Sequence, residues 1–206
     1  KRQDKLEKNM RHKIRLIKPG TSESGSKFEL NVPAGIFVSR QHAWAKILPN
    51  GLVRIGLDDL VRKIFEKVDH VELPRAGQTV NRGDTLFSLK YGDYSLDVPA
   101  PLSGTVIAVN TEHAEHPEWL AIKPFELSWM CGIEPSDLAG ELANLKIGKD
   151  SVDWYQQEID RFHELTGEFM KQASGDEKDD AEAGQQLSAT QYIEMLDSFA
   201  KPFQQA

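Results

Sequence analysis

The chain of 206 residues has a single cysteine, Cys131, and so cannot form a disulfide within itself. Its neighbours Trp129, Met130 and Ile133 predict a buried, unreactive thiol. A protein that does not depend on disulfides suits a reducing compartment, and we expect a cytoplasmic location. No apolar run of about 18 residues could span a bilayer. The chain begins with lysine, so an anchor or signal upstream of Lys1, with membrane association, is kept as an alternative.

The sequence also lacks the motifs that accompany common catalytic sites. It has no phosphate-binding glycine loop, no Gly-x-Ser-x-Gly turn and no His-Glu-x-x-His motif. His113 and His116 would share one face of a helix, but two imidazoles without further ligands do not make a metal site. The net charge of -7 disfavours nucleic-acid binding. We therefore expect no catalytic residues, no metal site and no nucleic-acid partner, and the protein is not expected to be an enzyme.

Charge is concentrated in two segments of opposite sign. Residues 1–18 hold eight Lys and Arg residues and only two acids, and a Ser- and Gly-containing stretch follows them. This composition makes residues 1–34 a basic N-terminal arm and linker. We expect the arm to contact other protein subunits or, through residues 1–18, an anionic membrane surface; a solvated tail is the simpler alternative. Residues 174–187 form an acidic linker.

Short strand-like runs dominate residues 35–147. They are separated by turn sequences such as Pro49-Asn50-Gly51 and Tyr91-Gly92-Asp93, and several alternate apolar and polar residues. Short strands at close spacing indicate a small barrel or sandwich, so the expected class is mainly β. The predicted strands are 36–38, 43–47, 53–55, 68–73, 85–90, 94–98 and 105–109.

Two amphipathic helices are predicted after this region, at residues 148–173 and 188–206. In both, apolar residues recur every three or four positions, which places them on one stripe that must be covered. Their aromatic residues are our candidates for anchoring a protein partner, because such residues dominate interface energetics. The alternative is that the helices pack back on the barrel. The candidates are Trp154, Tyr155, Tyr192, Phe199 and Phe203.

Several motifs appear in a fixed order between Gly35 and Leu145. They include His42-Ala43-Trp44, then Val71-Glu72-Leu73-Pro74, and finally Ala100-Pro101-Leu102-Ser103-Gly104. In this order and spacing the chain resembles the glycine cleavage system H protein family. The resemblance implies a barrel-sandwich hybrid of the type that carries lipoyl or biotinyl groups, followed here by C-terminal helices.

The same resemblance implies a carrier lysine that this chain does not have. H proteins carry lipoate on one lysine at a hairpin tip, eleven residues before the glycine of a Pro-x-Ser-Gly turn and three residues after a glutamate. Here these two positions hold Asp93 and Lys90. A carboxylate cannot form the amide link, so Asp93 cannot carry lipoate. Lys90 lies three residues earlier, on the opposite strand face and away from the tip.

We therefore interpret the chain as a non-enzymatic, H-protein-like scaffold or adaptor subunit of a larger assembly, with no cofactor. Its partners would be other protein subunits, contacted through the C-terminal helices and the basic arm. The alternative is a carrier of lipoate or another acyl group on Lys90, serving a one-carbon, sulfur or redox multienzyme system.

Overall fold

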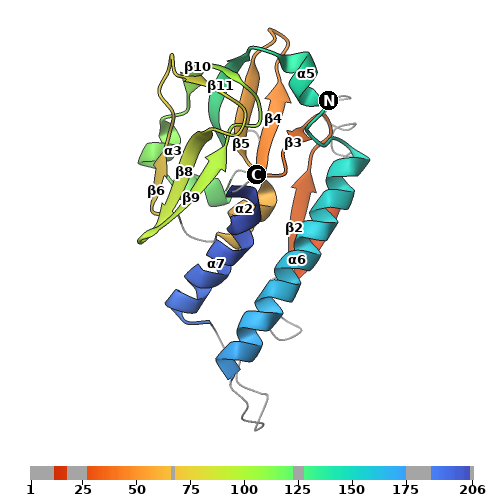
Figure 1. Cartoon of the computed structure of the whole chain (residues 1–206), viewed down its shortest axis with the longest axis vertical. Helices are drawn as coiled ribbons and strands as arrows, with labels where there is room; N and C mark the ends of the chain where they lie inside the picture. The colour runs from red at the N-terminus through yellow and green to blue at the C-terminus, as the bar shows by residue number, and fades with distance from the viewer. Residues whose placement is uncertain (1–11, 18–26, 66–67, 123–127, 175–186, 205–206) are drawn as a thin grey trace.

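The computed structural model describes residues 12–17, 27–65, 68–122, 128–174 and 187–204 (Figure 1). Short strands fill the first two thirds of the chain, and two long helices follow them. The strands are β1 (His12–Ile17), β2 (Lys27–Val32), β3 (Phe37–Val38), β4 (Ala43–Ile47), β5 (Val53–Leu57), β6 (His70–Glu72), β7 (Thr79–Val80), β8 (Thr85–Tyr91), β9 (Tyr94–Pro99), β10 (Gly104–Val109) and β11 (Trp129–Pro135). The helices are α2 (Asp59–Ile64), α3 (Glu112–Glu115), α4 (Trp119–Ile122), α5 (Leu138–Leu142), α6 (Lys149–Ser174) and α7 (Ala189–Gln204).

The described strands form three antiparallel sheets. The largest has the order β3-β4-β5-β11-β10-β7, a second has the order β6-β8-β9, and β1 pairs with β2. Buried side chains from the two larger sheets, such as Ile55 and Leu96, belong to one hydrophobic core. This arrangement confirms the predicted class: a mainly β, lipoyl-domain-like barrel-sandwich followed by helices.

One glycine shows how tightly this core is packed. A Cβ atom on Gly56 would lie 2.7 Å from Cε2 of Trp44 and 2.6 Å from the carbonyl oxygen of Ser128. Trp44 is only 1% exposed, so its indole cannot move aside without disturbing the core. The glycine in β5 is therefore what allows the tryptophan of the His42-Ala43-Trp44 motif to pack closely against this strand.

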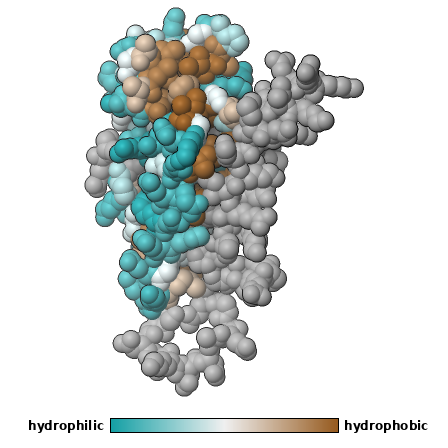
Figure 2. Space-filling model, turned by 90° about the vertical axis from the view of Figure 1, so that its right-hand side faces the viewer, coloured by the Kyte–Doolittle hydropathy of each residue, from teal (hydrophilic) through white to brown (hydrophobic). Residues whose placement is uncertain are grey.

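The two long helices cover the barrel along one side (Figure 1). α7 lies against β9 and beside α6. The apolar stripes predicted for both helices pack into the same core as the strands. This packing explains why each helix has one apolar face and one polar face. Seen from the side of α6, the described surface is mostly hydrophilic, with a hydrophobic area at the end where α5 lies (Figure 2). The buried members of the stripes are Trp154, Tyr155, Ile159 and Phe162 on α6, and Met195, Leu196, Phe199 and Ala200 on α7.

The N-terminal part differs from the predicted arm and linker of residues 1–34. β1 and β2 pair as an antiparallel hairpin, with His12 opposite Val32, and β1 lies beside α6. Leu30 and Val32 are buried in the main core, so the part of the chain that builds the core begins before residue 35. Residues 1–11 and 18–26 of the predicted arm and residues 175–186 of the predicted acidic linker lie outside the described residues.

None of the described helices is long and apolar enough to cross a membrane. Cys131 is fully buried in β11, as the sequence predicts, and burial raises the pKa of its thiol to about 12.

Candidate functional site

The hairpin of β8 and β9 carries the position at which H proteins are expected to attach lipoate. Tyr91 lies opposite Tyr94, which leaves Gly92 and Asp93 as a two-residue turn. Gly92 has a φ of 55°, the left-handed conformation that such tight hairpins favour in glycine. Its amide donates to Oδ2 of Asp69 at 2.8 Å, which fixes the turn to the preceding loop. Asp93 therefore lies at the exposed tip, and it places a carboxylate at the position where the family resemblance leads us to expect the carrier lysine.

Lys90 lies below this tip, within strand β8. It is opposite Ser95 on one side and His70 on the other, and is thus part of the sheet rather than of the turn. Its ammonium group donates to Oε1 of Glu72 at 2.6 Å. This hydrogen bond and charge hold the pKa of Glu72 below its usual value. The amine of Lys90 is therefore held beside the sheet by the carboxylate of Glu72.

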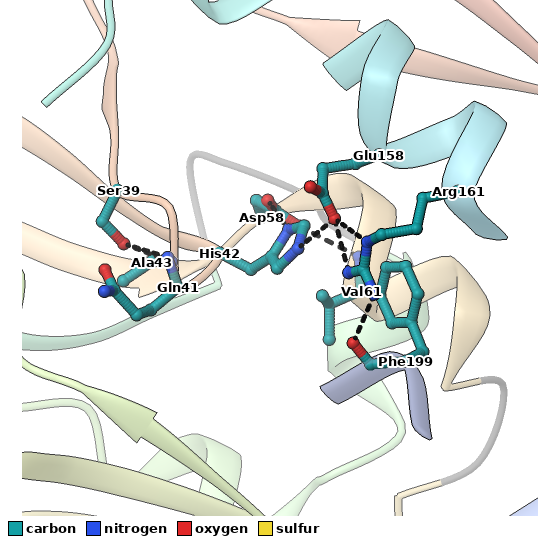
Figure 3. Close-up of polar contacts among 9 residues, drawn as sticks. All are labelled: Ser39, Gln41, His42, Ala43, Asp58, Val61, Glu158, Arg161 and Phe199. Carbon is teal, nitrogen blue, oxygen red and sulfur yellow. Dashed lines mark hydrogen bonds and ion pairs between the residues drawn. The ribbon is translucent and has the colours of Figure 1, made fainter. Parts of the chain in front are cut away.

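A second arrangement of functional side chains lies under the helices and centres on His42 (Figure 3). His42 has a φ of 63° in the turn before β4 and is completely buried. Its Nδ1 lies 2.7 Å from Oδ2 of Asp58, while Oδ1 of Asp58 accepts from the amide of Val61 at 2.9 Å and caps α2. On the other side, Nε2 of His42 lies 3.6 Å from Oε2 of Glu158 on α6.

The charge state of His42 follows from these two carboxylates. Burial by itself lowers the pKa of an imidazole, because it penalises the charged form. Asp58 and Glu158 together outweigh this effect and raise the pKa of His42 to about 9. His42 is therefore an imidazolium at neutral pH, held between one carboxylate of the barrel and one of α6.

Arg161 extends the arrangement to α7. Its Nη2 donates to Oε2 of Glu158 at 2.6 Å, and its Nη1 donates to the carbonyl oxygen of Phe199 at 3.0 Å. Its guanidinium carbon also lies 4.2 Å from the centre of the Phe199 ring. Burial tends to raise the pKa of Glu158, but His42 and Arg161 lower it below its usual value. A continuous series of polar contacts from Asp58 and His42 through Glu158 to Arg161 thus joins the barrel to α6, and Arg161 joins α6 to α7.

This buried chain does not have the geometry of an active site. His42 and Asp58 are both 0% exposed, so a substrate cannot reach them in this conformation. Elsewhere, His113 is buried and His116 is exposed. Across the residues that the structure describes, no group of three or more His, Cys, Asp or Glu side chains could hold a metal ion. What the arrangement can do is hold the helices in place.

Most of the aromatic residues that were candidate anchors for a partner instead pack within the chain itself. Trp154, Tyr155 and Phe199 are buried, and the ring of Trp154 lies 4.9 Å from that of His42. Tyr192 is half-buried and donates its hydroxyl to the carbonyl of Ile64. The side chain of Phe203 lies outside the described residues. The structure therefore corresponds to the alternative in which these aromatics pack on the chain's own barrel.

The sequence places His42 in the His42-Ala43-Trp44 motif but does not directly indicate its partner on α6. A signal was present, because Glu158 lies four residues after Trp154 and three after Tyr155, within the stripe predicted to be buried. A carboxylate on a buried stripe needs a charged or hydrogen-bonding partner, so its position predicts a cationic or donor side chain on a facing element.

Comparisons of the sequence with protein families and with curated proteins all point to the same family. The family described as "Glycine cleavage H-protein" matches residues 36–158. A probable glycine cleavage system H protein of Thermococcus gammatolerans is 38% identical over 117 residues, which are 57% of this chain and 87% of that protein. One of Pyrococcus furiosus is 35% identical over 126 residues, 61% of this chain and 93% of that protein. The glycine cleavage system H protein of Anoxybacillus flavithermus is 32% identical over 132 residues, 64% of this chain and 99% of that protein.

A solved structure is also similar. The crystal structure of a glycine cleavage system H protein from Mycobacterium marinum has 26% sequence identity to this chain and a TM-score of 0.49. It covers 54% of this chain and 96% of its own chain. The family match described above ends at residue 158, so most of α6 and all of α7 lie beyond it.

Proposed function

This chain belongs to the glycine cleavage H-protein family, and we propose that it acts as a scaffold or adaptor subunit of a larger protein assembly without carrying lipoate. The observation that supports the proposal is the hairpin tip, where Asp93 forms a tight turn with Gly92. The family resemblance assigns the carrier lysine to this position. A carrier needs an amine on that tip. The fold of the family is retained here, while the group that its carrier chemistry requires is replaced.

The position of Lys90 supports the same proposal. A ligase that modifies a hairpin tip must reach an amine that projects from it, whereas the amine of Lys90 is paired with Glu72 beside the sheet. Removing this pairing would not move Lys90 to the tip, because β8 is fixed in register with both β6 and β9. The geometry therefore disfavours the alternative carrier function at this lysine.

Intact mass spectrometry tests the absence of lipoate. The full chain, produced in cells with an active lipoyl ligase, should have its unmodified mass. The double variant Lys90→Glu/Asp93→Lys restores the family's glutamate and lysine at their spacing, and we expect it to gain the mass of one lipoyl group. The single variant Lys90→Arg is the matched control and should differ from wild type only by the mass change of the substitution itself. A lipoyl group on wild-type protein that disappears in Lys90→Arg would show a carrier and refute the proposal.

We also propose that protein partners contact the outer surface of the C-terminal helices. These helices extend beyond the family match, and their core-facing stripes are used within the chain. Their outer faces carry exposed polar residues such as Gln157 and Asp160. The basic residues at the N-terminus would add electrostatic attraction to an acidic partner.

Site-specific photo-crosslinking in the native cell tests this contact surface. A photoreactive residue at the exposed position Gln157 should trap a partner subunit, and one at the exposed position Glu134 of β11 should not. Both positions are solvent-exposed, so the comparison controls for accessibility. Crosslinks that form only at Glu134 would place the partner on the barrel and contradict the proposed surface.

A further inference from the structure

A polar cleft is lined by residues from the end of α5 to the start of α6 and by residues of neighbouring turns. Figure 1 shows α5 and the start of α6 at the same end of the molecule. The volume of the cleft is about 470 Å³, within the range of small-molecule sites. Four separate parts of the chain meet around it: the turn between β3 and β4, the turn between β7 and β8, the connection between β9 and β10, and the segment from the end of α5 to the start of α6. The charged residues that line the cleft are Arg40, Arg82, Lys146 and Asp150.

Three of these residues are the cations Arg40, Arg82 and Lys146. Among the described residues, none of the three is in an ion pair with an acidic side chain. The chain carries a net charge of -7, so three cations and a single carboxylate, that of Asp150, along one cleft are contrary to its general charge balance. Cations held together in this way repel each other, and a bound anion would relieve the repulsion.

The backbone under the cations is fixed. The amide and carbonyl of Lys146 both bond to Val38, each at 2.8 Å. The amide of Arg82 donates to Oγ of Ser103 at 2.8 Å. Next to Arg40, Oγ of Ser39 accepts two backbone amides at 3.2 Å. Binding at this cleft would therefore require little ordering of the main chain, which lowers its entropic cost.

We propose that this cleft binds a small phosphate-bearing molecule. Two guanidinium groups and an ammonium group suit the several oxygens of a phosphate, because arginine can donate two parallel hydrogen bonds to such a group. Asp150 on the wall accepts hydrogen bonds only, so the ligand is expected to carry a hydroxyl or amine beside its phosphate. The site shares no residue with the hairpin tip, and the proposal holds whether or not the chain carries lipoate.

Calorimetric titration of the full chain with pyrophosphate, at low ionic strength, tests the site. We expect saturable binding to wild-type protein and a loss of affinity of about tenfold or more in Arg40→Gln/Arg82→Gln, since each substitution removes a charged donor. Arg75→Gln, an exposed arginine outside the cleft, is the matched control and should bind like wild type. Asp150→Asn should bind pyrophosphate more tightly, because a repulsive charge is removed.

Three results would overturn the proposal. One is the absence of saturable pyrophosphate binding at millimolar concentrations. Another is equal affinity of wild type and the double arginine variant, which would place the anion elsewhere. The third comes from a parallel titration with citrate: binding at least as tight as that of pyrophosphate would make this a carboxylate site. Unchanged thermal unfolding of the double variant would show that its weaker binding is not caused by loss of fold.

Discussion

A buried imidazolium holds barrel and helix together at His42. The pKa of His42 is about 9 in the folded chain, against an ordinary value of 6.5, so the protonated form favours folding. Its contribution is complete below pH 6.5, decreases between pH 6.5 and 9, and is lost above pH 9. The size of the shift corresponds to about 3 kcal/mol of unfolding free energy.

His42→Gln should therefore destabilise the protein by about 3 kcal/mol at pH 6, since it leaves Asp58 buried without its cation. The difference between wild type and variant should shrink as the pH rises to 9.5. Urea unfolding of both proteins at several pH values measures this difference, and titrating groups that do not interact with His42 cancel in it. A difference that stays constant with pH would show that His42 contributes through packing alone.

At the level of single residues, the sequence allows a carrier position to be proposed, whereas it does not reveal the charged contacts. Asp93 could be assigned by counting back from Gly104, because a family pattern fixes spacing along the chain. The pairing of His42 with Asp58 and Glu158 could not be counted in this way. Those residues come from three elements that only the packing of α6 on the barrel brings together.

Helix α7 acts as a part of the core rather than as an appendage. Phe199 is 0% exposed, its ring lies 5.5 Å from that of Phe162 on α6, and its carbonyl accepts from Arg161. Phe199→Ala should lower the unfolding free energy by about 3–5 kcal/mol, because it leaves a cavity between the two helices. Urea unfolding followed by circular dichroism measures the loss.

The exposed residue Glu194 on the same helix provides the control. Glu194→Ala should change stability by less than about 0.5 kcal/mol, because surface substitutions outside special contacts have small effects. If Phe199→Ala is as mild as this control, then α7 does not stay packed on the barrel in solution. Its apolar stripe would then be available to a partner, as the sequence interpretation held.

The elements themselves were largely predictable, because their signals are local. Helices α6 and α7 lie within two residues of the predicted ranges, and the turn at Gly92-Asp93 is where its glycine predicts it. What an amphipathic stripe packs against is a tertiary property that periodicity does not contain. The β1–β2 hairpin was missed for a related reason: the many charges of residues 1–18 favoured a solvated arm, while the pairing with β2 depends on the distant core that buries Leu30 and Val32.

At the scale of the whole molecule, one hydrophobic core runs from β2 through both larger sheets to α7. The family match covers residues 36–158, yet buried residues outside that range, including Leu30 and Phe199, belong to the same core. The extensions at both ends are therefore built into the domain. A scaffold benefits from this arrangement, because helices that are fixed to the barrel present a partner with a pre-organised surface.

A continuous core predicts that barrel and helices unfold together. In Trp154→Phe the three remaining tryptophans all lie in the barrel part, so their fluorescence reports the barrel, while circular dichroism at the helical band reports mainly α6 and α7. The two signals should show the same midpoint in a urea titration, because the charge chain through His42 and the shared core couple them. Loss of the helical signal before the fluorescence change would instead mark α6 and α7 as a separately unfolding unit. If the helices unfold separately, the chain without residues 187–206 should still contain a folded barrel. If barrel and helices unfold together, this deletion should abolish the cooperative unfolding transition in both the fluorescence and the circular dichroism signal.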